Sequence, residues 1–417
     1  MVVFNPGSAS LKFEVIEAEV PVESVVRGRK LLRGVVEPIG EHSKLVLFDG
    51  QKAVPQEELE IRDHGQAAEQ VLNSMDSGKF SAHGIASTND AQIVGHRVVH
   101  GGARYSEPVL IDDAVIKAIE ELEVLAPLHN AGASAVIRAT RAKLGERIPA
   151  VAVFDTGFHR TIPDRARIYA IPWELTQRYG IRRYGFHGVS HNYLLLRYAE
   201  LTETPLERTN IISLHLEGGS SATAVVGGKS IDTSMGFTPL EGLVMGTRSG
   251  DIDPALVPFL AQKEKVDVTT IEAWLNKRSG LLGVSGRSQD TRVLVPHAAE
   301  DERTELALDI FAYRVRKYVG AYLAATGGVT AVIFGGGIGE NTPDVRRRIC
   351  EGLEWFGLRF DPELNATTID HEGRITQDGS RLHAYVIPTE EGLMIAHEAL
   401  RCYGRTTAHG VNGANLN

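Results

Sequence analysis

The sequence predicts an α/β protein made of two duplicated halves. Strand patterns alternate with helical patterns along the 417 residues, which is typical of α/β architecture. One local pattern also occurs twice, about half a chain apart. Near the start, an apolar strand runs through Asn5-Pro6-Gly7-Ser8 into a second strand at 11–16. Past the middle, a strand at 211–214 runs through Glu217-Gly218-Gly219-Ser220-Ser221 into another at 222–226.

Both repeats are expected to form hairpins whose turns suit a phosphate or another oxyanion. Glycine lets the backbone approach a ligand closely, and neighbouring N–H groups can converge on its negative charge. Neither turn fits the strand-to-helix P-loop, because the chain has no GxxxxGKS or GxxxxGKT motif. A single Gly-Ser turn is usually only a turn, so the functional interpretation depends on the repetition.

The other elements follow from hydrophobic periodicity and from residues that begin or end helices. Apolar runs bounded by Gly, Pro or Asp predict further strands at 30–37, 44–48, 93–100, 150–154, 331–334 and 385–388. Apolar residues three or four apart predict helices at 66–75, 112–122, 130–144, 190–200, 252–262, 270–276, 306–326 and 391–400. A boundary near Asp155 separates two halves that each open with a β-rich part and end as α/β.

Composition excludes several classes of protein. The net charge is −9 and no long run of lysine or arginine stands out, which disfavours nucleic acid and membranes as partners. No stretch of 18 apolar residues is present, so we expect no membrane span. Cys350 and Cys402 lie far apart, which fits a reducing cytoplasm. A strand begins at once, so no signal peptide is expected, and the tail 405–417 is expected to be disordered.

The strand at 93–100 carries a candidate for anion binding. By the two-residue period of a strand, Arg97 and Val99 point to one face, and the alternate residues His96, Val98 and His100 point to the other. An arginine beside a small apolar residue suits a carboxylate or phosphoryl group next to an apolar wall. A surface ion pair is an equally good interpretation of Arg97 alone.

Three histidines and an aspartate lie near predicted element ends. His129 precedes a helix, where a structural role is commoner than a catalytic one. His187 and His191 are four residues apart, but we reject zinc. If Ser190 caps the helix, the pair does not share a helix face, and no glutamate follows the first histidine as HExxH requires. Asp155 ends a buried strand, where α/β proteins place functional groups, although turn chemistry also explains it.

The second half and the C-terminal region add charged and glycine-rich loops. Arg248 lies between glycines in a polar loop, as a clamp on a phosphoryl group would. Gly335 to Asn341 follows a strand and can take a nucleotide against bare backbone. Glu390 and Glu391 can hold a hard cation through water or simply begin a helix. Together these residues favour phosphoryl transfer over acyl hydrolysis, because transfer needs positioning and charge neutralisation more than a covalent nucleophile.

The segment Asn5-Pro6-Gly7-Ser8-Ala9-Ser10-Leu11-Lys12-Phe13 resembles the N-terminal signature of the acetate kinase (acetokinase) family of short-chain carboxylate kinases. Further segments match that family in order across essentially the whole chain: 95–102, 125–130, 154–156, 184–191, 232–254, 334–341 and 387–391. The resemblance implies two duplicated βββαβαβα domains of the actin, sugar-kinase and Hsp70 type (ribonuclease H-like) around a central cleft. It implies an N-terminal lobe of residues 1–155 plus 386–417, including a returning C-terminal helix, and a nucleotide-binding lobe of residues 156–385.

The resemblance implies the reaction ATP + acetate ⇌ ADP + acetyl phosphate, by direct in-line transfer, with ATP as co-substrate and Mg²⁺ (or Mn²⁺) as the metal ion. It also implies a cytoplasmic homodimer with no nucleic-acid or membrane partner. Propionate or butyrate as acceptor, and GTP or pyrophosphate as donor, stay open. A non-catalytic nucleotide switch of the actin or Hsp70 type is the alternative from another class.

The resemblance also implies site residues. The catalytic residues would be Arg97, His129, Asp155, His187 and Arg248, with the two arginines bracketing the carboxylate and the moving phosphoryl group. The phosphate turns would be lined by Asn5, Ser8, Ser10, Lys12, His215, Gly218 and Gly219. The adenosine side would comprise Asp290, Thr291, Arg292, Gly335, Gly336, Gly337, Gly339 and Asn341. The acyl pocket would be Arg97, Val99, Leu128, Phe186 and Pro239. The metal side would be Asn5, Asp155 and Glu391, with Glu390 as the alternative to Glu391.

Three positions depart from the family pattern. Gly218 stands where the family has the asparagine of Leu-Gly-Asn-Gly-Ser, and Glu217 adds a negative charge beside it. Thr291 stands where an aromatic residue is common. Gly392 replaces the second carboxylate of an Asn-Glu-Glu run. These departures bear on the phosphate donor and on metal affinity rather than on the class of reaction.

Overall fold

The computed structural model describes residues 1–417 except 19–27, 41, 50–51, 86, 125 and 414–417. The chain divides into two compact units. Unit 1 comprises residues 1–158 and 390–417, and unit 2 comprises residues 159–389. The boundaries expected from the sequence followed residue 155 and preceded residue 386. Each unit is described by itself below.

Unit 1 contains a mixed sheet in which eight strands are described, in the order β5-β4-β3-β2-β1-β6-β8-β7. The strands are β1 Val2–Pro6, β2 Leu11–Glu17, β3 Arg29–Glu37, β4 His42–Asp49, β5 Lys52–Glu60, β6 Val94–Val98, β7 Val109–Leu110 and β8 Ala150–Phe154. β1 and β2 form the expected antiparallel hairpin. β6 pairs in parallel with both β1 and β8, so these three strands end at the same edge of the sheet.

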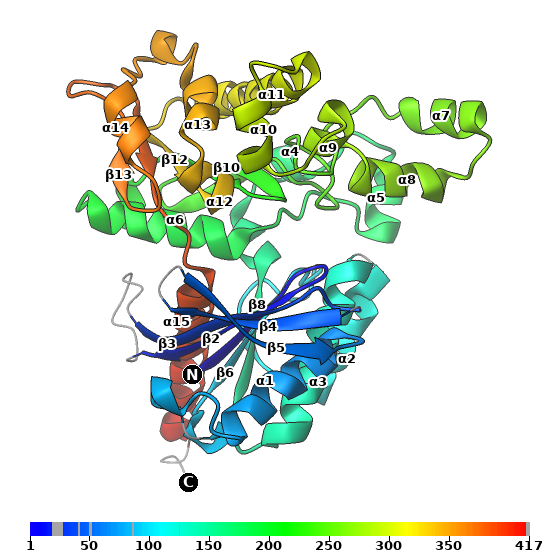
Figure 1. The fold of residues 1–417 in the computed structure, drawn as a ribbon, viewed down its shortest axis with the longest axis vertical. Helices are drawn as coiled ribbons and strands as arrows, with labels where there is room; N and C mark the ends of the chain where they lie inside the picture. The colour runs from blue at the N-terminus through cyan, green and yellow to red at the C-terminus, as the bar shows by residue number, and fades with distance from the viewer. Residues whose placement is uncertain (19–27, 41, 50–51, 86, 125, 414–417) are drawn as a thin grey trace. The chain divides into compact units, whose positions relative to one another are not determined.

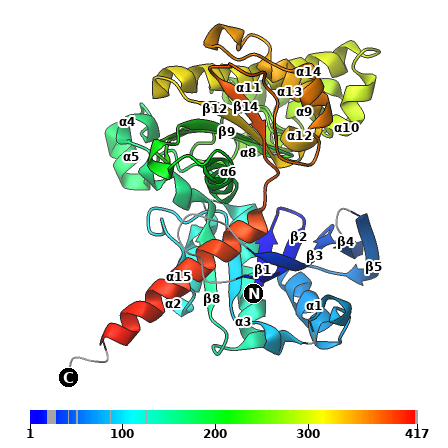
Figure 2. The same ribbon diagram turned by 90° about the vertical axis from the view of Figure 1, so that its left-hand side faces the viewer.

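Helices cover both faces of the sheet of unit 1 (Figures 1 and 2). They are α1 His64–Asp76, α2 Asp113–Glu121, α3 Pro127–Leu144 and α15 Glu391–Gly413. Neighbouring residues of β6 show the alternation, because Gly95 packs against Ile395 of α15 whereas His96 contacts Thr140 of α3. α15 therefore covers the face opposite α1 and α3, and its first residue lies close to the strands that it packs on.

Unit 2, which is described throughout, has a six-stranded sheet in the order β11-β10-β9-β12-β14-β13. Its strands are β9 Ile211–Leu216, β10 Ser220–Val226, β11 Lys229–Thr233, β12 Ala331–Gly335, β13 Gly373–Arg374 and β14 His383–Val386. β9 and β10 form the second expected hairpin, and β12 pairs in parallel with both β9 and β14. The order β11-β10-β9-β12-β14 repeats the order β3-β2-β1-β6-β8 of unit 1, which confirms the duplicated α/β fold.

The helices of unit 2 are α4 Asp164–Arg167, α5 Trp173–Tyr179, α6 Gly188–Leu201, α7 Leu256–Glu264, α8 Val268–Lys277, α9 Gly280–Ser285, α10 Thr291–Leu294, α11 Glu302–Thr326, α12 Gly336–Asn341, α13 Pro343–Cys350 and α14 Pro362–Thr367. α6 packs on one face of the sheet, where Ser213 of β9 contacts His191. The alternate residues of β9, such as Leu214, join Phe311 of α11 in the core on the other face.

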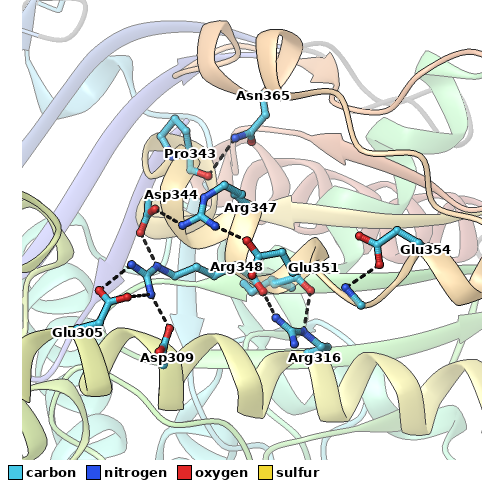
Figure 3. A network of polar contacts seen from close by, with 12 residues as sticks. Glu305, Asp309, Arg316, Pro343, Asp344, Arg347, Arg348, Glu351, Glu354 and Asn365 are labelled. Atoms are coloured by element: carbon cyan, nitrogen blue, oxygen red, sulfur yellow. Dashed lines mark hydrogen bonds and ion pairs between the residues drawn. The ribbon is translucent and has the colours of Figure 1, made fainter. Parts of the chain in front are cut away.

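An ion-pair network joins α13 to α11 (Figure 3). Arg348 of α13 pairs with Asp344 on its own helix, and with Glu305 and Asp309 on α11. Arg316 of α11 donates in return to the carbonyl oxygen of Arg348. Because α13 directly follows α12, these contacts also hold the glycine-rich segment that ends β12.

Three local expectations were wrong. α3 begins at Pro127, so His129 lies in its first turn rather than before it. α6 begins at Gly188 with His187 in the N-cap position, which places Ser190 inside the first turn rather than at the cap. α15 continues to Gly413, so residues 405–413 are helical rather than disordered. Within the described part of the chain, none of the helices has the length and apolar character that crossing a membrane requires.

Candidate active site

Unit 1 gathers four polar side chains where its parallel strands end. Asn5 lies on β1, Arg97 on β6, and Asp155 directly after β8, while Glu391 begins α15. The carboxyl ends of neighbouring parallel strands meet at one edge of a sheet, which is where open α/β sheets bind ligands. We call these four residues the Arg97 cluster.

Arg97 is the centre of this cluster. Its Nε and Nη2 donate to the two oxygens of Asp155 at 2.9 and 2.6 Å, and its Nη1 donates to Asn5 Oδ1 at 2.7 Å. Asp155 is fully buried, and the Arg97 side chain is 13 % exposed. The pair is therefore bidentate and shielded from water, the geometry in which a charge-assisted hydrogen bond is strongest. Arg97 therefore holds Asp155 and Asn5 in place.

Glu391, rather than Glu390, faces the Arg97 cluster. Its Oε2 accepts from Asn5 Nδ2 at 2.7 Å and lies 3.7 Å from Arg97 Nη1. Glu390 instead contacts Lys30 on β3. Carboxylate and amide oxygens are the ligands that magnesium prefers, so this donor set fits the ion. Among the described residues, however, no group of three His, Cys, Asp or Glu side chains is placed to hold a metal, so an ion here needs water or phosphate oxygens as well.

The first phosphate-type turn is closed and anchored. Gly7 N donates to Ser10 O at 2.8 Å, and His64 of α1 donates to Gly7 O at 2.8 Å. Ser8 and Ser10 border a surface pocket of ≈490 Å³. Lys12 follows on β2 with an exposed side chain. The turn thus presents hydroxyls and an ammonium group to solvent, as a phosphate site requires.

Two other predicted residues of unit 1, Val99 and His129, lie near the start of α3. Asn130 exchanges two 3.0 Å hydrogen bonds with the backbone of His100, which ties this helix start to the segment after β6. Val99 in that segment is buried, and His129 precedes Asn130 in the first turn. The side chain of Leu128 lies outside the described residues. The roles of these residues in acyl binding and catalysis stay predictions.

In unit 2, two histidines meet on one serine. His187 Nδ1 lies 3.0 Å from Ser221 Oγ, and His191 Nε2 lies 2.7 Å from the same oxygen. Both rings reach the start of β10, although His187 lies at the N-cap and outside the helix that carries His191. The HxxxH spacing was the signal that could have found this arrangement. The His187 ring also lies 4.4 Å from the ring of His215 on β9.

The histidines behind this contact are buried and neutral. Burial lowers the pKa of His191 well below its ordinary value and lowers the pKa of His159 to about 4. His159 donates from Nε2 to the carbonyl oxygen of Phe186 at 3.0 Å. His187 itself adopts the left-handed conformation, with φ 57°. Such strain in a non-glycine residue persists only where its surroundings impose it, and it is commoner at functional sites.

Arg248 is partly buried in unit 2 and has no acidic partner among the described residues. Its Nη1 donates to Pro239 O at 3.2 Å and lies 3.8 Å from Met245 Sδ. No carboxylate of the described residues forms an ion pair with it, and burial lowers its pKa. A Cβ on Gly219 would lie 3.3 Å from Arg248 Nη1 and 3.4 Å from His187 Nε2. Arg248 and His187 therefore flank the same bare turn, and an anion there would compensate the buried charge.

Sequence reasoning missed the residues that hold the loop beneath Arg248. Arg183 Nη2 pairs with Glu241 at 2.6 Å, while its Nη1 donates to the carbonyl oxygens of residues 233–235 at 3.0–3.2 Å. Tyr169 donates to the other oxygen of Glu241. These contacts fix the loop that carries Pro239, a predicted acyl-pocket residue. No pattern in the sequence marks them, because their partners are mostly backbone atoms of a distant segment.

The glycine segment after β12 has one position that requires glycine and one that is open. Gly336 has φ +75°, and a Cβ there would lie 2.6 Å from Leu216 O. A Cβ on Gly337 would meet only Glu217 Cγ, at 4.0 Å. Arg346, fully buried, donates to the carbonyl oxygens of Gly339 and Glu340, both at 2.8 Å. Arg346 thus anchors the end of the segment, and Gly337 leaves an exposed stretch of backbone without a side chain.

The other predicted nucleotide residues have local explanations. Asp290 caps α10 and pairs with Arg292 at 2.7 Å. Thr291 is buried, with its hydroxyl 3.2 Å from that of Thr342. Gly218 accepts a 3.1 Å hydrogen bond from Gly246 N, which joins the second turn to the Arg248 loop. Buried Gly335 and Gly339 and exposed Asn341 complete the set, whose roles in binding stay predictions.

Comparisons with known proteins agree along the whole chain. The model of the acetokinase family matches residues 1–397. Acetate kinases from Solibacter usitatus and Chloroherpeton thalassium are 47 and 46 % identical, over 96 and 97 % of this chain and 98 and 99 % of theirs. The crystal structure of Porphyromonas gingivalis acetate kinase aligns with TM-score 0.88 at 38 % identity, covering 96 % of this chain and 99 % of that one. A propionate kinase from Francisella tularensis aligns with TM-score 0.84, also at 38 % identity, covering 96 and 98 %. The chain belongs to the acetokinase family.

Proposed function

We propose that this chain is an acetate kinase that transfers a phosphoryl group reversibly between ATP and acetate, giving ADP and acetyl phosphate. The family assignment supports a phosphotransferase with a carboxyl acceptor. The structural observation that carries the proposal is the partly buried guanidinium of Arg248, which has no carboxylate partner among the described residues and lies beside His187 at a bare glycine turn. A cation buried in this way needs an anionic ligand, and a transferring phosphoryl group is one.

The proposed mechanism is direct in-line transfer. Acetate is ionised at neutral pH, so its oxygen can attack the γ-phosphorus without a general base. The transition state is loose, and its charge spreads over the equatorial oxygens. Arg248 and His187 donate to those oxygens, and Ser221 keeps the imidazole of His187 oriented through its 3.0 Å contact. The turn at Gly219 lets the phosphate approach the backbone closely.

In this proposal the Arg97 cluster serves the anionic acceptor and the metal ion. Arg97 keeps Asp155 oriented through its two hydrogen bonds, and its positive charge attracts an anionic acceptor. Asn5, Asp155 and Glu391 would hold magnesium, in part through water. The ion would supply positive charge to the phosphate oxygens. The exposed Lys12 and the hydroxyls of Ser8 and Ser10 would bind phosphate oxygens at the first turn, and His129 would support the transition state.

Acetate is the first acceptor to test, and propionate is the second. Val99, Leu128, Phe186 and Pro239 are the proposed acyl pocket, and Phe186 is fully buried. One methylene changes binding by only about 1–3 kcal/mol, so closely related acids compete in such a pocket. A structure named propionate kinase aligns with this chain as closely in identity as a named acetate kinase does, which favours propionate as the alternative.

ATP is the proposed donor. The open surface at Gly337 leaves room for a purine, which pyrophosphate would not use. Thr291 is turned inward and would not stack on the base, and Asp290, Arg292 and Asn341 would line the same side. Gly218 removes a side-chain donor to the phosphates, so we expect weaker discrimination among donors than an asparagine there would allow.

A homodimer in the cytoplasm completes the proposal. α7 and α8 pack together and expose Leu256, Phe259 and Val268 (Figure 1), which would be covered by a second copy of the chain. Both cysteines are free, which fits a reducing compartment. Light scattering of the purified protein and of a Phe259→Glu variant measures the mass, and a monomeric mass for the unsubstituted chain would contradict the dimer.

A hydroxamate assay tests the function. Acetate, propionate and butyrate are each incubated with ATP, GTP or pyrophosphate, with magnesium or manganese, and acyl phosphate is trapped with hydroxylamine. We expect the highest kcat/KM with acetate and ATP. Turnover of ATP without any acyl phosphate would refute the proposal in favour of a nucleotide switch, and higher kcat/KM with propionate would reassign the acceptor.

A further inference from the structure

We propose that Lys30 and Glu14 are positioning residues that determine which of two adjacent glutamates serves the Arg97 cluster. Glu390 and Glu391 stand side by side at the start of α15. Only Glu391 contacts the cluster, through Asn5 Nδ2 at 2.7 Å. We call Glu14, Lys30 and Glu390 the Lys30 clamp. The inference rests on the proposed function in one respect, namely that the Arg97 cluster serves substrates.

The Lys30 clamp joins three elements of unit 1. The ammonium group of Lys30 on β3 contacts Glu390 Oε2 and lies 3.6 Å from Glu14 Oε1 on β2. The side chains of Lys30 and Glu14 are 24 and 14 % exposed, so this cation is shared between two carboxylates that water screens only in part. Arg33, directly across from Glu14 in the sheet, adds a second positive charge. Glu390 is therefore held on the β3 side of the helix start.

Gly392 provides the space that the clamp needs. A Cβ at this position would lie 2.2 Å from Glu14 Oε2 and 2.5 Å from Glu14 Cδ. The backbone of Gly392 lies outside the left-handed region, so its conformation does not require glycine. Glycine lowers helix stability relative to alanine, so a glycine in the first turn of α15 calls for a packing reason. That reason is the carboxylate of Glu14, which occupies the volume of the missing side chain.

The clamp has a consequence for charge at the Arg97 cluster. Arg97 already faces two carboxylates, Asp155 and Glu391. If Glu390 were released, it could turn toward the guanidinium of Arg97, which lies 3.7 Å from the carboxylate of the adjacent residue Glu391. A third carboxylate would lower the positive potential offered to anionic substrates and would compete with Glu391. Lys30 prevents this by neutralising Glu390 in place.

The test compares Lys30→Met, Glu390→Gln and the double variant. Lys30→Met should lower kcat/KM for ATP about tenfold, the scale of one charge-assisted hydrogen bond, and should raise the magnesium concentration at half-maximal rate. Glu390→Gln sets the baseline, because it has no carboxylate to release. The double variant should return to that baseline. Gly392→Ala should resemble Glu14→Ala, since its methyl group displaces the Glu14 carboxylate.

The matched control is Lys79→Met, which removes an exposed ion pair with Glu57 elsewhere in unit 1 and should leave kcat/KM unchanged. Urea unfolding of the metal-free proteins provides a readout apart from activity. The midpoint shifts of Lys30→Met and Glu390→Gln should be non-additive, because each variant breaks the same contact.

Two outcomes would overturn the inference. A double variant as poor as Lys30→Met would mean that the released carboxylate is not the cause, and additive midpoint shifts would mean that the two side chains do not interact. The proposed function fails in a different way, through absence of acyl phosphate from the unsubstituted chain. The metal-free unfolding data would still decide whether the clamp exists in that case.

Discussion

Replacing Arg248 by methionine should abolish most activity without weakening the fold. The partly buried guanidinium contacts Pro239 O and Met245 Sδ, and no described carboxylate pairs with it. Burial lowers the pKa of Arg248, which means that the folded state disfavours its charge. Methionine keeps much of the apolar stem and removes that charge. We therefore expect the free energy of unfolding to stay the same or to rise.

Replacing Arg97 by methionine should have the opposite effect on stability. Asp155 is fully buried and accepts hydrogen bonds of 2.9 and 2.6 Å from Arg97. Removing one partner of a buried ion pair leaves the other charge uncompensated and typically costs about 3–5 kcal/mol. The Arg97→Met variant should lose that much of its free energy of unfolding. The contrast between the two arginines follows only from their partners.

Both variants should lose activity to a similar degree. Removing one group that stabilises transition-state charge typically costs about 3–4 kcal/mol, or roughly 10²–10³ in kcat. The hydroxamate assay at saturating acetate and ATP measures kcat, and urea unfolding measures stability in parallel. Near-normal turnover of Arg248→Met, or destabilisation of that variant as large as that of Arg97→Met, would refute the reasoning.

Three further predictions concern the glycine segment, its buried arginine and acid stability. Gly337→Ala should fold normally, because its Cβ faces open space, but the methyl group should raise KM for ATP by covering the bare backbone. Gly336→Ala should destabilise the protein, since it combines φ +75° with a Cβ 2.6 Å from Leu216 O. Equal unfolding midpoints for the two variants would contradict this prediction. Arg346→Lys should raise KM for ATP more than KM for acetate, because one ammonium group cannot replace the contacts of the guanidinium with Gly339 and Glu340. Steady-state kinetics with each substrate varied in turn measure the two KM values. The free energy of unfolding should fall as the pH drops from about 6.5 toward 4, by about 1.4 kcal/mol per pH unit for each buried histidine. Burial lowers the pKa of His96 to about 3 and that of His159 to about 4, so in this window the unfolded chain binds protons that the folded chain does not. Urea unfolding at pH 7 and pH 5 measures the slope, and His96→Gln should reduce it.

The elements and their order could be predicted because their signals are local. Both hairpins, the buried strand before Asp155 and the long helix α11 follow from periodicities of two and of about four residues. The repeat of one strand–turn–strand pattern was enough to predict duplicated halves. The end of α15 could not be predicted, because residues rich in Gly, Asn and Thr have little helical preference of their own.

The candidate site could be predicted only in part. Arg97 was recognised because it shares one face of a strand with Val99, and Asp155 because it ends a buried strand. Glu390 and Glu391 were both candidates for a cation, and the resemblance added Asn5 and the preference for Glu391. Arg183 and Arg346 were missed, because each holds carbonyl oxygens of a distant segment, and carbonyl oxygens carry no sequence signal. The contact of His187 and His191 with Ser221 was missed, because it depends on how β10 packs beside the start of α6.

The amino-acid sequence by itself determined the α/β class, the duplication, the family and the residue types available for phosphoryl transfer, since all of these are written in local spacing and in ordered motifs. The tertiary structure alone decided which groups neutralise one another. From the sequence alone, Arg97 and Arg248 are both candidates for binding an anion. In the structure, Arg97 is paired with a buried carboxylate and Arg248 is not. Likewise, Glu391 rather than Glu390 meets Asn5 because Lys30, from a strand some 360 residues away, holds its neighbour. Such partners depend on long-range packing, which brings together charges that the order of residues along the chain does not relate.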